Sequence, residues 1–490
     1  MDVLMKETIT KADWLNSVQC LTLGWHGLRT APEAPRESDR FRMEQGQQVG
    51  ALARELFPKG IWGSQTSGHT GAEATQRLLA DASTETLFEA RFDAGPFVAR
   101  ADIITREGNA WHVLEVKSSF SDTKSMASLI SDLAYTVMVL RRAGIKITKA
   151  SLVLLSRSYR YGDKTDLLFN VADKTADVEV RVAEFELAAD KFAVVLLAEN
   201  PPEARLVAVC RECRFFADRC LGAGIDHTVL ELPSLHQIKF KQLSIDGIIN
   251  LASVPATFKL TSRQERVRDA ALSGKIFVDS NLSALLGSIS WPCHYLDFET
   301  VATVLPLYQG HGCHQQVLTQ FSIHYRDSID AEVRHSEYLA DASRDCQREV
   351  AEALINALSN QGAVIVYGSF EKTRINGLRD AFPDLADPLQ AIVERLVDLC
   401  SVISTGIYHP EFRGKYSIKK VLPALVPELS YAELDIGDGD TAIVRFARMA
   451  RGDISGDQAI VTRQQLLEYC KLDTFAMVRL HQKLAELSVG

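Results

Sequence analysis

The chain has 490 residues, 46% of them hydrophobic and 24% charged, which is typical of a globular protein and long enough for about two to four domains. Its net charge of −9 excludes a generally basic nucleic-acid-binding protein, although local basic patches remain. No apolar stretch approaches the roughly 18 residues of a membrane span. The opening "MDVLMKETITKADW" lacks the basic and apolar regions of a signal peptide. We therefore expect a cytoplasmic protein that does not bind membranes.

Residues 1 to about 225 alternate between helical and strand patterns. "RMEQGQQVGALARELF" (42–57) and "MASLISDLAYTVMVLRRAG" (126–144) have helical periodicity, and Gly144 ends the second. "TLFEARF", "FVARADIIT", "WHVLEVKSS" and "KASLVLLS" read as strands, with a turn at "REGN" (106–109) between the second and the third. This alternation predicts an α/β fold.

An acidic pair and a lysine gather on this hairpin. Glu115 and Lys117, in "LEVKSS", are two apart on a strand and share a face. With the turn centred near residues 107 and 108, Asp102 falls opposite Val113 and diagonal to Glu115, within about 7–8 Å. Two acids beside a lysine can bind a divalent metal and leave the ammonium to stabilise developing charge on a phosphate. An exposed E-x-K pair on a strand is the equally simple alternative.

The segment "RADIITREGNAWHVLEVKSS" resembles the motif of PD-(D/E)xK nucleases of the RecB type, which hydrolyse DNA phosphodiesters with the help of a metal. The resemblance implies that Asp102 and Glu115 are metal ligands and that Lys117 is the catalytic lysine. It also implies a further acidic ligand at Glu89, in "LFEARF".

Two positions differ from that family's pattern. The family often carries a metal-binding His four residues after a Gly, where this chain has Gly50 after Gly46. The later helix often carries a Gln, where this chain offers Thr136. These differences leave open an alternative function, a nucleic-acid-binding scaffold in which one or both nuclease sites are degenerate.

Four of the nine cysteines flank this block. Cys210, Cys213 and Cys220 crowd into "CRECRFFADRC", and Cys20 lies far upstream. Four thiolates suit a [4Fe–4S] cluster or Zn²⁺. One early and three late cysteines resemble the iron–sulfur motif of a nuclease subgroup that includes CRISPR-associated adaptation nucleases. The resemblance favours a [4Fe–4S] cluster, with Zn²⁺ as the alternative, while Cys20 could also be a buried thiol without a ligand.

Residues 226 to 285 look mostly helical. Leu243, Gly247 and Ile248, in "FKQLSIDGIINLASVP", resemble a helix-hairpin-helix, although a helical linker is the simpler interpretation.

A second α/β series follows from residue 286, with strands at "HYLDFET", "TQFSIHYR", "AEVRHSEYLA" and "GAVIVYG". In "CHYLDFET", Asp297 and Glu299 face the same side of a strand, about 6–7 Å apart. Like charges so close are tolerable if cations lie between them. A polar edge strand is the alternative, but the apolar approach "SISWPCHYL" disfavours it.

Two helix starts follow downstream. Ser369 is a plausible N-cap with Glu371 in the first turn of its helix. Thr462 and Gln465 have the spacing of a capping box and predict the start of the long helix "TRQQLLEYCKLDTFAMVRLHQKL".

The acids together resemble the DnaQ-like (DEDD) 3′–5′ exonucleases of the RNase H-like fold. Asp297 and Glu299 match the D-x-E motif, Glu371 takes the usual Asp position of the second motif, and Tyr469 with Asp473 matches the Y-x-x-x-D of the tyrosine subclass. The resemblance implies that the four carboxylates hold two Mg²⁺ or Mn²⁺ ions, which clamp the scissile phosphate and activate water that the tyrosine orients.

Asp398 and "GKYSIKKVL" (414–422) match flanking features of that family, and Lys419 and Lys420 could meet phosphates. The whole order resembles a bacterial family of RecB-type nucleases with a C-terminal RNase H-like domain. We expect a RecB-type domain at 1–225, a helical linker at 226–285 and an exonuclease domain at 286–490. The expected partner is DNA, single-stranded or at duplex ends, with a ribonuclease as the alternative.

Overall fold

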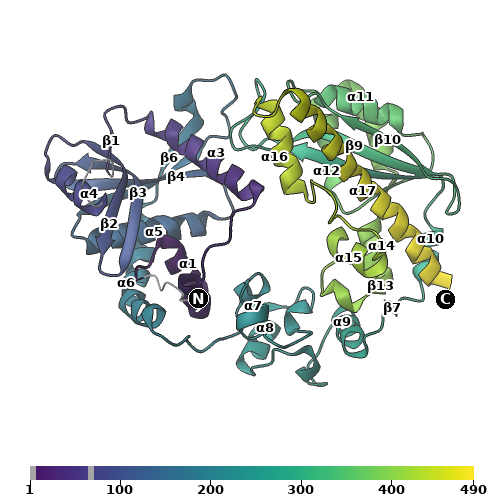
Figure 1. Cartoon of the computed structure of the whole chain (residues 1–490), viewed down its shortest axis with the longest axis horizontal. Coiled ribbons are helices and arrows are strands. Elements are labelled where there is room, and N and C mark those ends of the chain that lie inside the picture. Colours follow the sequence, from purple (N-terminus) through teal and green to yellow (C-terminus); the bar gives the residue numbers. More distant parts are fainter. Residues whose placement is uncertain (1–6, 64–70, 490) are drawn as a thin grey trace. The chain divides into compact units, whose positions relative to one another are not determined.

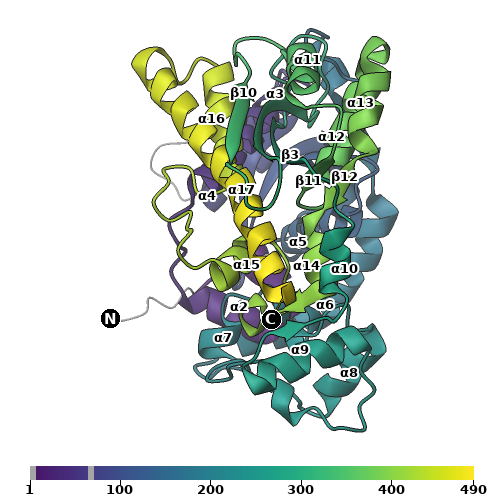
Figure 2. The ribbon, with the colours of Figure 1, turned by 90° about the vertical axis from the view of Figure 1, so that its right-hand side faces the viewer.

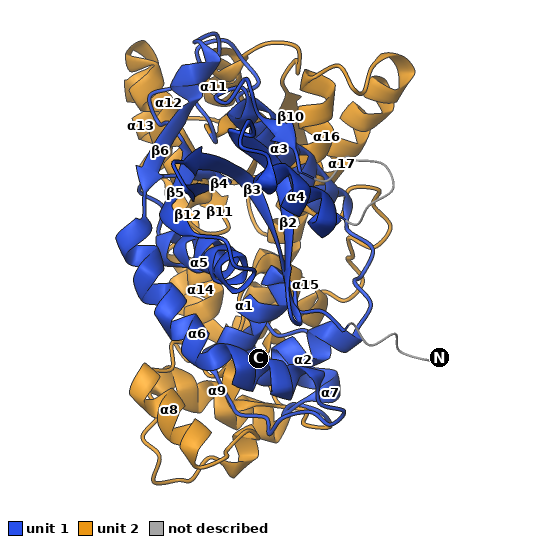
Figure 3. Cartoon of the chain, turned by 90° about the vertical axis from the view of Figure 1, so that its left-hand side faces the viewer, with its two compact units in different colours: residues 1–223, 304–314 blue, residues 224–303, 315–490 orange. Residues whose placement is uncertain are grey.

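Two sheets organise this computed structural model, which describes residues 7–63 and 71–489 (Figure 1). The protein is α/β. Its contacts divide it into two units, the first made of residues 1–223 and 304–314 and the second of residues 224–303 and 315–490 (Figure 3). Residues 224–303, which include the segment expected to be a linker, thus belong to the second unit. Residues 1–6, part of the segment examined for a signal peptide, lie outside the described residues.

The sheet of unit 1 has six strands in the order β1-β2-β3-β4-β5-β6. The β1/β2 and β4/β5 pairs are parallel and the others are antiparallel. The strands are β1 (Ile61–Trp62), β2 (Thr86–Ala94), β3 (Phe97–Glu107), β4 (Ala110–Phe120), β5 (Ile147–Leu155) and β6 (Phe169–Asp173). The helices of the unit are α1 (Lys11–Gln19), α2 (Leu21–Arg29), α3 (Glu37–Arg54), α4 (Gly71–Ala80), α5 (Met126–Arg142), α6 (Thr175–Leu197) and α7 (Phe216–Arg219).

Alternate residues of the unit 1 strands enter two different cores. Leu152 and Leu154 of β5 join a large cluster with α5 and α6, whereas Val153 and Leu155 join a smaller cluster with Val49 of α3. This alternation is the period of two that a strand imposes. The sheet is therefore covered on both faces, with α3 on one and α5 on the other (Figure 1).

The β3–β4 hairpin differs from its predicted register by two residues. Glu107 pairs with Ala110, and Ile103 with Leu114, so Asp102 comes level with Glu115 and not with Val113. The prediction was wrong because the turn is the two-residue Gly108–Asn109, and Gly108 takes the left-handed conformation (φ +62°) that such tight hairpins favour. The shift brings the two acids directly opposite each other.

The sheet of unit 2 has five strands in the order β10-β9-β8-β11-β12, antiparallel from β10 to β8 and parallel from β8 to β12. The elements of the unit up to this sheet's last strand are α8 (Gln237–Ile245), α9 (Ser262–Ser273), β7 (Phe277–Val278), α10 (Leu282–Gly287), β8 (Cys293–Val301), β9 (Val317–Arg326), β10 (Arg334–Leu339), α11 (Gln347–Ala357), β11 (Ala363–Val366), α12 (Phe370–Ala381), α13 (Ala386–Val393) and β12 (Leu396–Asp398). The remaining elements are α14 (Leu399–Gly406), β13 (Ile407–Tyr408), α15 (Ile418–Leu425), α16 (Gly439–Ala450) and α17 (Gly456–Val489).

The long helix α17 packs on β8, β9 and β10 (Figure 2). It begins at Gly456, so the capping box predicted at Thr462 and Gln465 is wrong, and both residues lie inside the helix. The intervening sequence contains no helix breaker, and Asp457 provides the acid of the first turn. Gln465 instead donates from Nε2 to Oδ2 of Asp435 at 2.7 Å.

The segment that resembles a helix-hairpin-helix contains one α-helix. Leu243 is buried in α8, and Gly247 turns the chain with φ +65°. The chain then forms a single 3₁₀ turn at Leu251–Ser253 in place of a second α-helix.

Residues 304–314, which lie in the loop between β8 and β9, belong to unit 1. Val304 N–H donates to Oε1 of Gln45 at 2.6 Å, and Nε2 of His314 lies 2.6 Å from the carbonyl oxygen of Ser118. Cys313 joins the core cluster beneath α3. Among residues 7–63 and 71–489, no helix combines the length and the apolar character needed to cross a membrane.

Candidate functional site

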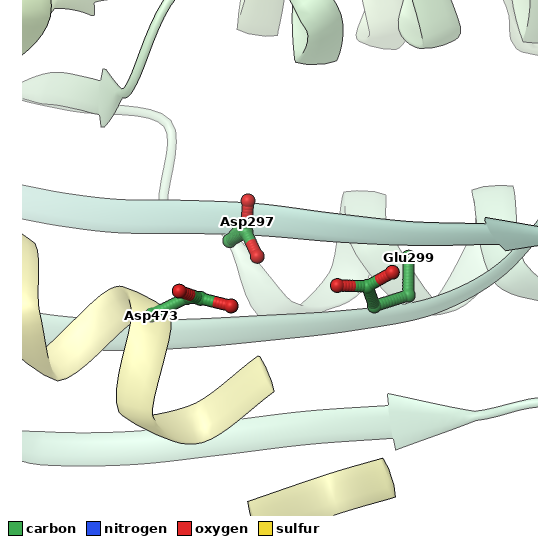
Figure 4. Close-up of side chains that lie close together, drawn as sticks. All are labelled: Asp297, Glu299 and Asp473. Carbon is green, nitrogen blue, oxygen red and sulfur yellow. The ribbon is translucent and has the colours of Figure 1, made fainter. Parts of the chain in front are cut away.

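Three carboxylates of unit 2 converge from two elements. Asp297 and Glu299 project from the same face of β8, and Asp473 reaches them from α17 (Figure 4). One oxygen from each lies within 4.8 Å of the others. Two of these acids lie on β8, and from β8 the sheet continues through β9 on one side and through β11 on the other. Open α/β sheets commonly bind ligands at such a change of direction.

Glu371 is the fourth acid of this group. It lies in the first turn of α12, is 3% exposed, and interacts directly with the side chain of Asp297. Its Oε2 atom is buried and has no hydrogen-bond partner in the structure. An unpartnered buried carboxylate oxygen is costly, so this atom is available to a cation.

The acids carry an excess of buried negative charge. Burial, together with the charge of Asp473, raises the pKa values of Asp297 and Glu299 well above their usual range. Burial also raises the pKa of Glu371 to about 7 and that of Asp473 to about 6. Carboxylate oxygens are the ligands that Mg²⁺ and Mn²⁺ prefer, so this donor set fits divalent cations, which would restore the ordinary ionisation of the acids.

Two tyrosines meet at Asp473. Tyr469, one turn before it on α17, interacts with its carboxylate through the hydroxyl. Tyr431, in the loop between α15 and α16, donates its hydroxyl to Oδ1 of Asp473 at 2.6 Å. The side chain of Lys419 lies beside both rings, with Nζ 5.7 Å from the ring centroid of Tyr431 and 5.8 Å from that of Tyr469.

Two flanking residues have local contacts within the fold. Oδ1 of Asp398 accepts the N–H groups of Gly368 and Cys400, at 2.8 and 2.9 Å, so this carboxylate caps α14 and holds the turn before α12. Lys419 donates to the carbonyl oxygen of Gly437 at 3.0 Å, whereas Lys420 is exposed.

The acids predicted in unit 1 line one pocket of about 850 Å³. Asp102 of β3, Glu115 and Lys117 of β4, and Glu89 of β2 all border it. Oδ2 of Asp102 accepts the N–H of Val116 at 2.8 Å, which fixes this carboxylate against the neighbouring strand. The structure thus brings together all four residues that the sequence pattern selected there.

Lysines surround the buried carboxylate of Glu115. Nζ of Lys11 lies 2.5 Å and Nζ of Lys117 lies 3.1 Å from its Oε1 atom, and Lys117 also pairs with Asp132 of α5. Burial opposes ionisation of Glu115, but the two ammonium groups outweigh it and lower its pKa to about 2. Burial and the charge of Glu115 together raise the pKa of Asp102 to about 7.

The negative charge of Glu115 is thus balanced by two ammonium groups, whereas that of Asp102 is not fully balanced. The Oε2 atom of Glu115 is buried without a hydrogen-bond partner, on the same side chain whose Oε1 atom is paired twice. Oε2 of Glu115 and the carboxyl of Asp102 therefore fit one divalent cation.

Glu89 has an unusual backbone conformation. Its φ of +51° lies in the left-handed region, and it is the residue at which the β2/β3 pairing is interrupted. Such strain in a non-glycine residue is commonly found at functional sites. Its Oε1 atom lies 3.8 Å from Nη1 of Arg54, another residue that borders the pocket.

Of the positions that differ from the RecB-type pattern, two border the pocket and one is buried within its helix. Gly46 and Gly50 of α3 both border the pocket, where they offer no side-chain ligand. Thr136 is fully buried, and its hydroxyl donates to the carbonyl oxygen of Asp132 at 3.4 Å, within its own helix.

The four flanking cysteines lie near one another. Burial raises the pKa of Cys210, and the thiols of Cys20, Cys213 and Cys220 raise it further. Cys210 also accepts the N–H of Val207 at 3.4 Å, a contact that stabilises a thiolate.

Sequence reasoning missed four side chains of these sites, namely Lys11, Arg54, Asp132 and Tyr431. For Lys11 a signal existed, because Thr10 and Asp13 form a capping box that starts α1 at this residue. That signal gives the helix start but not the strand that Lys11 faces. Tyr431 lies in a loop with no motif around it.

The comparisons with known proteins cover part of the chain. A family model described as "Domain of unknown function (DUF2779)" matches residues 294–417. That range contains Asp297, Glu299 and Glu371 and ends before Tyr431 and Asp473. The chain is also similar to "Uncharacterized protein UU173" of Ureaplasma parvum serovar 3, at 26% identity over an alignment of 215 residues that covers 39% of this chain. The match spans 31% of that relative's length.

Proposed function

We propose that this chain is a metal-dependent nuclease whose unit 2 removes nucleotides from the 3′ ends of nucleic acids. The observation that carries the proposal is the convergence of Asp297, Glu299 and Asp473, with Glu371 beside them, into one partly buried and under-compensated group. Bound there, two Mg²⁺ or Mn²⁺ ions would clamp the scissile phosphate and supply the nucleophilic hydroxide.

The chain's own residues would prepare that reaction. Glu371 and Asp473 are buried and Asp297 and Glu299 are partly buried, so electrostatic interactions among the four carboxylates are stronger than in bulk water. The Tyr469 hydroxyl, next to Asp473, would orient the attacking water. The Lys419 ammonium, whose charge acts on Glu299 and Asp473, would lower the negative potential that an incoming phosphate meets.

End-labelled DNA and RNA, incubated with the full chain and Mg²⁺ or Mn²⁺, test this proposal. We expect stepwise loss of 3′-terminal nucleotides, abolished by Asp297→Ala and slowed less by Tyr469→Phe than by Asp473→Ala. If Glu371→Ala retains full activity, the second-motif acid is misassigned. No 3′-terminal loss from any polymer would end the exonuclease proposal, and loss from RNA alone would make the chain a ribonuclease.

Unit 1 supports a second, RecB-type cleavage site. Asp102, Glu115, Glu89 and Lys117 border one pocket, and the donor set of the first two fits a cation. In an Asp297→Ala background, Lys117→Ala should leave metal binding largely intact and cripple cleavage, because the lysine supplies charge and no ligand oxygen. Unchanged cleavage in that variant would make unit 1 a nucleic-acid-binding module. The Gly46 and Gly50 positions, which offer no ligand, favour that alternative.

We further propose that Cys20, Cys210, Cys213 and Cys220 hold a [4Fe–4S] cluster. The order of one early cysteine and three late ones, which resembles that of cluster-bearing nucleases, supports this cluster over Zn²⁺.

A further inference from the structure

We propose that Tyr431 is a positioning residue of the unit 2 site, which holds Asp473 in the orientation that binds a divalent cation. The inference rests on the proposed function of that site and adds a residue to it. It starts from the short contact of 2.6 Å between the Tyr431 hydroxyl and Oδ1 of Asp473.

The contact leaves Asp473 free to be a ligand. An ionised carboxylate offers about four lone-pair directions, of which a hydroxyl donor uses one. Carboxylates that bind metals are usually fixed in this way by outer hydrogen bonds, and loss of such a partner typically costs 10–100-fold in metal affinity. Tyr431 therefore restricts how Asp473 turns without occupying its full donor capacity.

The loop that carries Tyr431 is fixed on both sides of this residue. On one side, Leu429 and the Tyr431 ring pack against the main core of unit 2. On the other, Oδ2 of Asp435 accepts from Gln465 of α17 at 2.7 Å, and the carbonyl oxygen of Gly437 accepts from Lys419 at 3.0 Å. Asp435 is thus bound to α17, the helix that carries Asp473, so the hydroxyl is presented to Asp473 by an anchored segment.

Tyr431 and Tyr469 approach Asp473 from different elements, with ring centroids 6.3 Å apart. Tyr469 belongs to α17 itself, and burial, together with the charges of Asp473, Glu299 and Asp297, raises the pKa of its hydroxyl. Tyr469 therefore faces the space between the acids, whereas Tyr431 fixes one acid from outside. The two hydroxyls therefore have different roles. Tyr431 sets the affinity of the site for the metal, and Tyr469 orients the attacking water.

Calorimetric titration of the full chain with Mn²⁺ tests this division without any nuclease assay. The Mn²⁺ sites that disappear in Asp473→Asn define the unit 2 site. We expect Tyr431→Phe to raise the Kd of those sites about tenfold. Tyr295→Phe is the matched control, because it also removes one buried hydroxyl contact of unit 2, the 2.8 Å bond to Nδ1 of His481, but touches no acid.

A kinetic comparison provides a second readout. Raising the Mn²⁺ concentration should restore the kcat of Tyr431→Phe and should not restore that of Tyr469→Phe. Equal Mn²⁺ affinity in Tyr431→Phe and the unsubstituted chain overturns the inference and leaves the proposed function standing. An equal loss of affinity in Tyr295→Phe also overturns it, because the effect would then follow from any lost hydroxyl. If the unsubstituted chain has no Asp473-dependent Mn²⁺ site, the proposed function fails first.

Discussion

At the scale of single residues, the acids of unit 2 repel one another unless a cation joins them. Lys419 acts on Glu299 and Asp473, yet the pKa values of the acids remain raised because burial and their mutual repulsion outweigh its charge. Removing one charge should therefore stabilise the metal-free protein, even though it removes a ligand.

Asp297→Asn makes this measurable. Without divalent cations, we expect the variant's Tm to rise by about 3 °C, since roughly 1 kcal/mol of repulsion relieved corresponds to 2–4 °C in a domain of this size. With Mn²⁺, the order should reverse, because only the unsubstituted chain gains binding energy. Differential scanning calorimetry checks both, and Asp330→Asn, an exposed acid of the same unit, is the control. A lower Tm in the metal-free variant would contradict the repulsion argument.

The same residues predict a dependence on pH. The folded-state pKa values of Glu371, about 7, and Asp473, about 6, lie above the ordinary values of 4.5 and 3.8. The folded state therefore holds more protons than the unfolded state between about pH 4 and 7, and the stability of the metal-free protein should fall as pH rises through that window.

Measurements of thermal unfolding at pH 5, 6, 7 and 8 without divalent cations test this predicted fall in stability. Saturating Mn²⁺ should flatten the fall between pH 5 and 7, because the bound cation keeps the acids ionised in the folded state. An equally steep fall with Mn²⁺ present would mean that other groups dominate the profile.

At the scale of elements, β2 carries a strained residue next to the unit 1 pocket. A left-handed conformation costs a non-glycine residue about 1–2 kcal/mol, and Glu89 adopts it in the middle of a strand. The strain persists because pairing with β3 resumes on both sides.

Two substitutions separate strain from charge. Glu89→Gly and Glu89→Ala both remove the carboxylate, but only glycine relaxes the backbone. We expect Glu89→Gly to melt about 3 °C higher than Glu89→Ala, and both to lose metal affinity at the unit 1 pocket equally. If the alanine variant is as stable as the glycine variant, Glu89 does not hold strained backbone.

Sequence patterns identified the elements better than their ends. The alternation in "CHYLDFET" predicted β8 and the shared face of Asp297 and Glu299, because side chains on a strand must alternate. The predicted β3–β4 register was wrong by two residues, because several turns fit "REGN" and only a turn at Gly108–Asn109 pairs Glu107 with Ala110. Tyr431 could not be predicted to face Asp473, because its place depends on tertiary anchoring of a loop.

At the scale of the whole molecule, the cysteine centre should stabilise one unit only. Cys210 and its three neighbours belong to unit 1, whereas the acids of the proposed exonuclease site belong to unit 2. Because the energy of metal binding contributes to folding, loss of a ligand should destabilise unit 1 and spare the chemistry of unit 2.

Cys210→Ser tests this separation. Anaerobically purified chain should be brown with about four irons, and the variant should lose the colour and part of unit 1's protection from proteolysis. Its 3′-terminal exonuclease activity should remain within about twofold. Cys346→Ser, a buried thiol of unit 2, should keep the iron. A colourless parent chain with one tightly bound zinc would overturn the iron assignment but keep the site.

The excursion of residues 304–314 into unit 1 has a consequence for synthesis on the ribosome. A unit that ends at residue 223 could fold as soon as it emerges, but Cys313 belongs to the core beneath α3 and Val304 bonds Gln45. At about 5–20 residues per second, the missing piece is translated roughly 5–20 s later. During that interval unit 1 has an incomplete core. Nascent chains should therefore expose apolar surface to chaperones over this interval.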